Sequence, residues 1–293
     1  MDPSIGPFYA PGVASTVLYE SADGVATLTL NRPDRLNTIV PELIDELREC
    51  LSRAREDDDV RAIRLRGAGR AFCAGYDISW GAEAMEAQEA EKPWDPIVDY
   101  RFMSRYVDAY MELWRSPKPV IAQVHGFCVG GGTDFALCSD LIVCAEDCRI
   151  GYPPARVWGS PTTSLWTHRI GPARAKRLLF TGDSLSGREA VEWGLATESA
   201  PADKLDERTE ILIGRIAQMP INQLMLMKLL VNQTLYAQGL HATQVLGTVF
   251  DGIARHTAEG YGFQQRAAEA GFREAVRERD QPFGDHGSST FKG

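Results

Sequence analysis

Long hydrophobic runs and an excess of positive charge are both missing from this sequence. No apolar stretch approaches the roughly 18 residues of a membrane-spanning helix, so we expect no membrane insertion. The chain of 293 residues carries 31 Lys and Arg against 40 Asp and Glu, a net charge of −9. Because an acidic chain repels polyanions, we expect no nucleic-acid partner, and any anionic ligand must bind at a local basic or N–H-rich site.

Metal-binding and secretory patterns are missing as well. The six cysteines form no Cys-x-x-Cys pair, and their spacing around His125 matches no zinc pattern. We therefore predict no metal site and interpret the cysteines as reduced, mostly buried side chains. The first residues, MDPSIGPFYAPGVAS, contain neither the basic nor the apolar segment of a secretory signal, so a cytoplasmic location is expected.

The sequence does contain strand-like segments that alternate with helix-like ones, followed by helices alone. The predicted strands are apolar or alternating segments, at 25–30, 61–66, 120–124 and 141–145. The predicted helices include one from Pro41 with Leu43, Leu47 and Leu51 on one face, one over 103–114, and one opened by the Ser186–Glu189 capping box. This order predicts an α/β fold with a helical C-terminal region.

The chain divides into four parts on this pattern. We expect a flexible arm over 1–15, an α/β core over 16–202, a helical region over 203–283 and a disordered tail over 284–293. The acidic, Ala-rich segment 80–100 is predicted to be a mobile helix or loop.

Two glycine-containing loops follow predicted strands: AFCAGYD at 71–77 and GFCVGGGTD at 126–134. Three glycines at a helix start leave N–H groups unpaired in front of the positive end of the helix dipole, which suits an anion or a developing oxyanion. Neither loop is a P-loop or a dinucleotide-binding loop. A glycine triplet alone also fits a tight turn that lets a strand and a helix pack.

Together with their flanks, these loops resemble the enoyl-CoA hydratase/isomerase family, the crotonase superfamily. The resemblance is carried by LTLNRPDRLN (28–37), AFCAGYDI (71–78), SPKPVIAQVHGFCVGGGTDFALCSDLIVCAED (116–147), LLFTGDSLSGREAVEWGLA (178–196) and RERDQPF (277–283). It implies a right-handed spiral of β-β-α units, C-terminal helices that build a homotrimer or hexamer, and an acyl-CoA thioester as substrate. Coenzyme A would enter as part of the substrate, with no other cofactor.

The resemblance also implies site residues. The main-chain N–H groups of Tyr76 and Gly131 would hold the thioester oxygen while an enolate forms. Substrate or CoA contacts would come from the same two loops and the turn before them, at Arg35, Ala74, Asp77 and Gly130. Arg35 equally fits a solvated turn arginine.

Asp134 falls where hydratases of this family carry the first of two catalytic glutamates, and it is our candidate base. As an alternative, it could be an acidic residue placed at a helix start by the dipole. The position of the second glutamate is Pro154, which cannot transfer a proton, and a third position used in other branches, Thr162, is uncharged. Ordinary two-glutamate hydration is therefore not expected.

Another group must supply any second proton transfer. Tyr152 is our candidate, and His168, Glu83 and Glu86 are the alternatives. Two tryptophans, Trp158 and Trp166, either line a pocket for a bulky or aromatic acyl group or belong to the core or an interface. Two functions stay open: an acyl-CoA-processing enzyme with Asp134 as base, or a non-catalytic acyl-CoA-binding protein.

Overall fold

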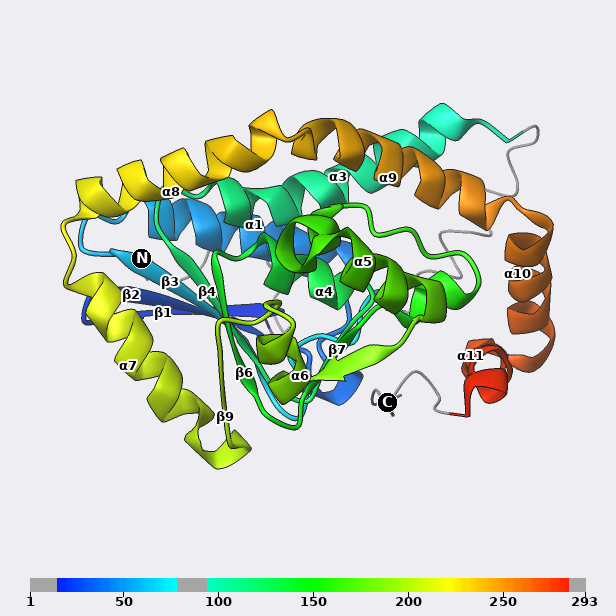
Figure 1. The fold of residues 1–293 in the computed structure, drawn as a ribbon, viewed down its shortest axis with the longest axis horizontal. Helices are drawn as coiled ribbons and strands as arrows, with labels where there is room; N and C mark the ends of the chain where they lie inside the picture. Colours follow the sequence, from blue (N-terminus) through cyan, green and yellow to red (C-terminus); the bar gives the residue numbers. More distant parts are fainter. Residues whose placement is uncertain (1–14, 78–93, 285–293) are drawn as a thin grey trace.

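The computed structural model describes residues 15–77 and 94–284, whose elements are drawn in Figure 1. A six-stranded sheet has the order β1-β2-β3-β4-β6-β9. Its strands are β1 (Val17–Ala22), β2 (Val25–Leu30), β3 (Ala62–Gly67), β4 (Val120–Val124), β6 (Leu141–Ala145) and β9 (Glu198–Ala200). The hairpin β1–β2 is antiparallel and turns at Asp23 and Gly24, both with positive φ, and the other neighbours are parallel.

A second sheet of three short strands lies beside the first and carries the glycine loops. It consists of β5 (Phe127–Val129), β7 (Arg149–Gly151) and β8 (Ser184–Ser186), with β5 and β7 parallel. The sequence predicted a loop over the whole of β5. A strand of three residues is too short to show a periodicity, and β5 exists only because β7 pairs with it.

Helices pack against the two sheets and against one another. The first group comprises α1 (Pro41–Glu56), α3 (Pro96–Arg115), α4 (Gly131–Cys138), α5 (Leu165–Thr181) and α6 (Gly187–Glu192). Leu43, Leu47 and Leu51 of α1 are buried, as their spacing predicted, and the Ser186 capping box is present. Helix α3 begins earlier than predicted, at Pro96, because the Asp95 side chain accepts a hydrogen bond from the N–H of Ile97.

Helices alone follow the large sheet up to Phe283. They are α7 (Leu205–Ala217), α8 (Ile221–Ala237), α9 (Leu240–Arg255), α10 (Ala258–Ala270) and α11 (Phe272–Asp280). Short 3-10 turns complete the fold: η1 (Pro33–Arg35), η2 (Pro153–Arg156), η3 (Ala202–Lys204) and η4 (Gln281–Phe283). Helices α8 and α9 run along one long side of the molecule, with α3 packed against α9 (Figure 1). None of the helices in the described ranges combines the length and apolar character that crossing a membrane requires.

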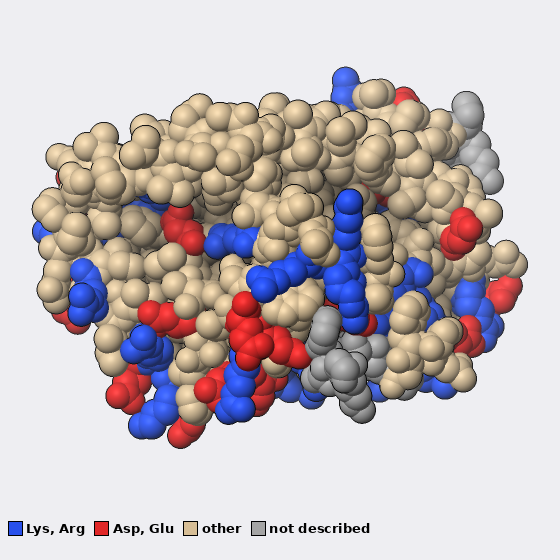
Figure 2. Space-filling model, viewed as in Figure 1, with Lys and Arg blue, Asp and Glu red and all other residues tan. Residues whose placement is uncertain are grey.

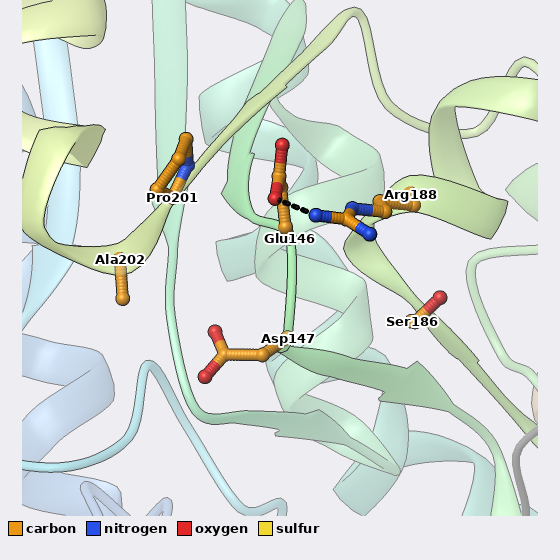
Figure 3. Close-up of a pocket in the computed structure, with 6 residues that line it drawn as sticks. All are labelled: Glu146, Asp147, Ser186, Arg188, Pro201 and Ala202. Atoms are coloured by element: carbon orange, nitrogen blue, oxygen red, sulfur yellow. Dashed lines mark hydrogen bonds and ion pairs between the residues drawn. The ribbon is translucent and has the colours of Figure 1, made fainter.

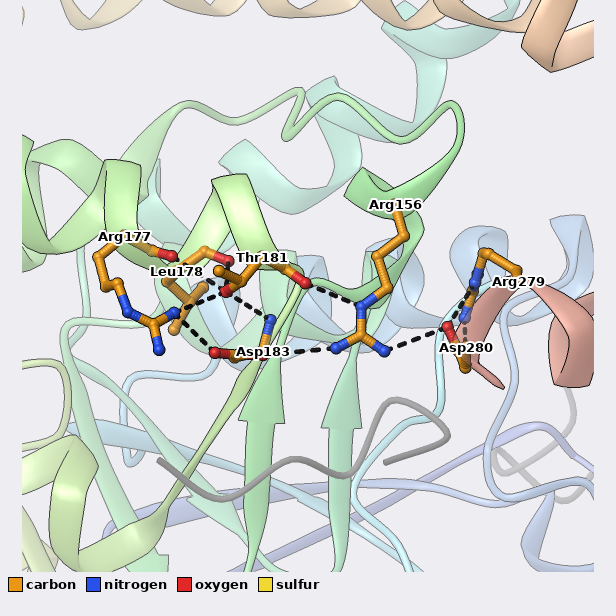
Figure 4. Close-up of polar contacts among 7 residues, drawn as sticks. All are labelled: Arg156, Arg177, Leu178, Thr181, Asp183, Arg279 and Asp280. Carbon is orange, nitrogen blue, oxygen red and sulfur yellow. Dashed lines mark hydrogen bonds and ion pairs between the residues drawn. The ribbon is translucent and has the colours of Figure 1, made fainter. Parts of the chain in front are cut away.

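A buried arginine ties the end of the helical region to the core (Figure 4). The Arg156 guanidinium donates to the Thr181 carbonyl at 2.8 Å and lies 3.4 Å from Asp183 and 3.3 Å from Asp280. The side chains of Arg156 and Asp280 are each 1% exposed, so these charges are paired rather than solvated. Through this cluster η2, the end of α5 and α11 are held together, close to Pro154.

Candidate active site

The two glycine loops lie side by side. The N–H of Cys73 donates to the carbonyl of Phe127 at 2.9 Å, and the N–H of Val129 donates to the carbonyl of Cys73 at 3.1 Å. A side chain on Gly132 is impossible in this arrangement, because its Cβ would lie 2.3 Å from the Cys73 carbonyl oxygen. Glycine at this position therefore serves the close approach of the loops.

Both predicted N–H donors lie at this junction. Gly131 is the first residue of α4, where N–H groups have no partner within the helix. The residues on either side of Tyr76 are both bonded to Ile39. The Ile39 N–H donates to the Gly75 carbonyl at 2.8 Å, and the Asp77 N–H donates to the Ile39 carbonyl at 2.9 Å. A Cβ on Gly75, whose φ is +91°, would lie 3.6 Å from the Gly131 nitrogen, so the two donor loops are in contact.

Asp134 lies in the first turn of α4 and is 1% exposed. The Thr163 hydroxyl donates to its Oδ1 at 2.5 Å, and the Thr163 backbone N–H bonds to the same carboxyl group. Burial raises the pKa of Asp134 to about 7, with a smaller increase from the charge of Asp251, while the bonds from Thr163 act in the opposite direction. A carboxyl group with a pKa near neutrality is suited to take up and return protons.

Three tyrosines surround this carboxyl group. The Tyr110 hydroxyl donates to the Tyr76 hydroxyl at 2.9 Å, and the Tyr152 hydroxyl donates to the Ser160 carbonyl at 2.8 Å. Burial raises the pKa of all three phenols well above 10, and the charge of Asp134 raises each further. All three are therefore neutral near pH 7. Sequence reasoning missed Tyr110, because its position on α3 is indistinguishable from that of a core residue.

Proline occupies the position of the expected second glutamate, facing the glycine loop. A Cβ on Gly130 would lie 3.3 Å from the Cγ of Pro154. Thr162 is buried beside α9, where its carbonyl would lie 3.3 Å from a Cβ on Gly247. Asp134 is the carboxyl group in the first turn after the glycine triplet, and Tyr76, Tyr110 and Tyr152 are phenols coupled to it.

Some of the predicted CoA-contacting residues are exposed, and others already form hydrogen bonds within the protein. Arg35 is exposed in η1. Ala74 lies in the first loop, where its N–H donates to the Leu36 carbonyl at 3.0 Å. Asp77 is held by Arg32 and by the Thr38 hydroxyl, each at 3.0 Å. Arg32 was missed by the sequence analysis, since only the fold brings it to Asp77.

The remaining candidates lie elsewhere. His125 directly follows β4, with its Nε2 2.9 Å from the Gly69 carbonyl, and His168 is half-buried on α5. Trp166 is part of the core, whereas Trp158 packs against Phe263 of α10 with ring centroids 4.8 Å apart. Glu83 and Glu86 lie outside the described residues.

All six cysteines are free thiols, and all but Cys50 are buried, as the sequence predicted. Among residues 15–77 and 94–284, no three His, Cys, Asp or Glu side chains gather in a way that could hold a metal ion.

A separate surface depression contains none of the predicted site residues (Figure 3). It is lined by Glu146, Asp147, Ser186, Arg188, Pro201 and Ala202. The Arg188 guanidinium pairs with the Glu146 carboxylate at 2.5 Å, and both Arg188 and Asp147 are exposed. Its charges are therefore largely paired or solvated.

Comparisons with known proteins identify the family of the chain. A family model described as enoyl-CoA hydratase/isomerase matches residues 20–265. The crystal structure of an enoyl-CoA hydratase from Mycobacterium smegmatis has a TM-score of 0.88 and 49% identity, covering 92% of this chain and 95% of its own.

Two curated relatives are similar in sequence. The 1,2-epoxyphenylacetyl-CoA isomerase of Escherichia coli strain K12 is 32% identical, over 74% of this chain and 81% of its own length. The (E)-benzylidenesuccinyl-CoA hydratase of Thauera aromatica is 31% identical, over 69% of this chain and 76% of its own length. The α/β fold with a helical C-terminal region, predicted from the sequence, is thereby confirmed. The chain belongs to the enoyl-CoA hydratase/isomerase family.

Proposed function

We propose that this protein is an acyl-CoA isomerase that moves a proton along the acyl chain through a thioester enolate. The observation that carries the proposal is the buried carboxyl group of Asp134, which has a pKa of about 7 and lies in the first turn after the glycine triplet. In the proposed step, Asp134 removes a proton from the carbon next to the thioester or from the vinylogous Cγ. The N–H groups of Tyr76 and Gly131 stabilise the negative oxygen that forms.

One carboxyl group is enough for this reaction. After accepting the proton, Asp134 is neutral and can return the proton to a different carbon of the same delocalised enolate, so the charges and atoms balance without a second acid. Hydration needs in addition a group that holds and activates water, and Pro154 cannot do so. We therefore favour isomerisation over hydration.

Tyrosine is the proposed source of any second proton. Tyr152 remains the candidate from the sequence, but its hydroxyl hydrogen is engaged by the Ser160 carbonyl. The Tyr110–Tyr76 pair is an alternative, because two hydroxyls joined by one hydrogen bond retain one further hydrogen to donate. In this pair the hydrogen left to donate is that of the Tyr76 hydroxyl, so the Tyr152→Phe and Tyr76→Phe variants distinguish the two by which one loses turnover.

Aromatic acyl groups belong among the substrates to be tested. The two curated relatives act, by their names, on phenylacetyl-type and benzylidenesuccinyl-type thioesters. We infer that a similar aromatic thioester is a reasonable substrate class here.

The reaction is tested by mass spectrometry of a panel of straight-chain and aromatic acyl-CoAs incubated with the protein in deuterated water. We expect deuterium uptake without addition of water. Gain of the mass of a water molecule would contradict the isomerase proposal and show hydration, and loss of a fragment would show cleavage. Tight binding with no exchange in any thioester would favour the alternative that Pro154 suggests, a non-catalytic acyl-CoA-binding protein.

We further propose that the protein forms a homotrimer or a hexamer through α8 and α9, and that it is cytoplasmic. The upper edge of the molecule, over these helices, is almost free of charged side chains (Figure 2). Large apolar residues are exposed there: Leu226, Leu229, Leu230, Val231, Leu246, Phe250 and Ile253. A helix that is apolar on nearly all sides, as α8 is, requires a covering partner.

The oligomer proposal predicts that Leu230→Arg dissociates the assembly, because a charge in an apolar interface must be desolvated without a partner. Leu230 is 65% exposed in the single chain, so the substitution should leave the fold of the subunit intact. Leu18→Arg, on β1 at 41% exposure, is the matched control and should change nothing. Sedimentation velocity measures both. A monomeric wild-type protein would contradict the proposal.

A further inference from the structure

Helix α9 is connected to the candidate base through the segment 160–164. Along this segment the Ser160 N–H bonds to the Asp251 carboxylate, and the Ser164 hydroxyl donates to the Thr243 carbonyl at 3.0 Å. Between these two contacts, the Gln244 amide donates to the Thr163 carbonyl at 3.1 Å. Gln244 is 4% exposed, so this bond is shielded from water.

The face of α9 that holds the segment is defined by spacing and by a close approach. Gln244, Gly247 and Asp251 follow one another at helical intervals and point toward the same side. A Cβ on Gly247 would lie 3.1 Å from the Pro161 carbonyl, which is tighter than ordinary contact. The missing side chain at Gly247 therefore lets the segment lie against the helix.

The other side of the same segment holds Asp134. Thr163 is fully buried and supplies two hydrogen bonds to this carboxyl group, one from its hydroxyl and one from its own N–H. Two bonds from a single residue fix the orientation of the carboxyl plane as well as its position. Thr163 thus lies between the base and α9, with its carbonyl held on the helix side.

We infer that Thr163 is a positioning residue for Asp134 and that α9, through Gln244 and Gly247, holds Thr163 in place. This inference rests on the proposed role of Asp134 as the base. The helical C-terminal region then contributes to catalysis by holding the base in position, because a displacement of about 1 Å in a reacting group can cost on the order of 10²-fold in rate. Thr163 itself has no proton-transfer role in this arrangement.

Several titratable groups lie close enough to Asp134 to interact with it. Asp251 is the other carboxyl group that acts on it. Burial raises the pKa of Asp251 as well, and Arg255, 3.3 Å away, opposes that rise as a counter-charge. The other titratable groups coupled to Asp134 are phenols and thiols: Tyr76, Tyr110, Tyr152, Cys73, Cys128 and Cys138. Burial raises the pKa of each of them, so they stay neutral near pH 7 and leave Thr163 as the group that stabilises the carboxylate.

The test is a direct titration of Asp134 by ¹³C carboxyl NMR in protein labelled at aspartate, with the signal assigned by its loss in Asp134→Asn. Thr163→Val keeps the shape but removes the hydroxyl, so we expect the pKa to rise by about one to two units. Thr163→Ser should restore the wild-type value. Gly247→Ala displaces the segment 160–164 without touching Asp134. It should therefore raise the pKa of Asp134 by a smaller amount and shift the pH profile of turnover in the same direction.

Gly262→Ala on α10 is the control, because within residues 15–77 and 94–284 nothing lies within 4 Å of the added Cβ. An unchanged Asp134 pKa in both Thr163→Val and Gly247→Ala would overturn the inference. Because the titration needs no turnover, it separates this inference from the proposed function. A shifted pKa combined with full turnover in Asp134→Asn would refute Asp134 as the base and leave only a structural link from α9 to Asp134.

Discussion

Replacing Asp134 with asparagine should lower turnover by about 10²–10⁴-fold while leaving acyl-CoA binding nearly unchanged. The amide has nearly the shape of the carboxyl group and can still accept the Thr163 hydroxyl, so the site stays formed without its base. Steady-state kinetics and calorimetric binding of a substrate thioester measure the two quantities. Asp147→Asn, at an exposed position in the surface depression, is the control and should change neither.

The same variant should be more stable than the wild type above pH 7. Burial raises the pKa of Asp134 from 3.8 to about 7, so the folded state binds a proton that the unfolded state releases between these values. The wild type therefore loses stability as pH rises from about 4 to about 7, and the loss then stays constant. Asparagine does not titrate, and the gain should be about 2–4 kcal/mol at pH 8 and vanish near pH 4.

Urea unfolding of the wild type and Asp134→Asn at pH 8 and near pH 4 measures this difference in stability. Asp140→Asn is a contrasting variant, which should be less stable than the wild type. Asp140 pairs with Lys228 at 2.7 Å, and the lysine side chain is 7% exposed. Removing that partner leaves a buried cation, so Asp140→Asn should destabilise by about 3–5 kcal/mol. If Asp134→Asn proves less stable than the wild type at pH 8, Asp134 is held as a structural carboxylate.

The second large effect is expected from Gly131→Ala, which should reduce kcat by about 10²–10³-fold. The added Cβ would lie 2.7 Å from the Tyr76 ring and 3.1 Å from the Cδ1 of Ile39. It therefore pushes apart the two loops that carry the N–H donors. Substrate binding should suffer less than turnover, because the proposed role of these donors is to stabilise the charged oxygen of the enolate.

A double variant separates loop displacement from general damage. Tyr76→Ala removes the ring that the new Cβ meets but keeps the main-chain N–H, so Gly131→Ala should cost less in that background. Gly262→Ala is the matched control for a glycine-to-alanine change in a helix with open space. Equal losses from Gly131→Ala with and without the Tyr76 ring would contradict the role assigned to loop spacing.

Local sequence predicted the elements whose pattern is carried by neighbouring residues. The segments 25–30, 120–124 and 141–145 became β2, β4 and β6 with the predicted bounds, and the predicted strand 61–66 is shifted by one residue in β3. The glycine triplet led correctly to the start of a helix, which is α4 in the structure. Each of these depends on spacing within a few residues.

Contacts between residues far apart in the chain were not predicted from the sequence. Thr163 bonds to a carboxyl group 29 positions away, and Gln244 reaches Thr163 across 81 positions. The Tyr110–Tyr76 pair spans 34 positions, and Tyr110 looked like a core residue of α3. The strands β5, β7 and β8 have three residues each and form because they pair with one another. These features exist only after the chain has folded.

The most direct test of Asp134 as the base is the pH dependence of deuterium incorporation into an accepted acyl-CoA, followed from about pH 5 to about pH 9. An essential base with a pKa of about 7 predicts a rate that rises with pH through a single ionisation near that value and then levels off. In Asp134→Asn, incorporation should fall by about 10²–10⁴-fold and should no longer change with pH near 7. A rate in the wild type that does not change near pH 7, or incorporation at the wild-type rate in Asp134→Asn, would contradict the assignment.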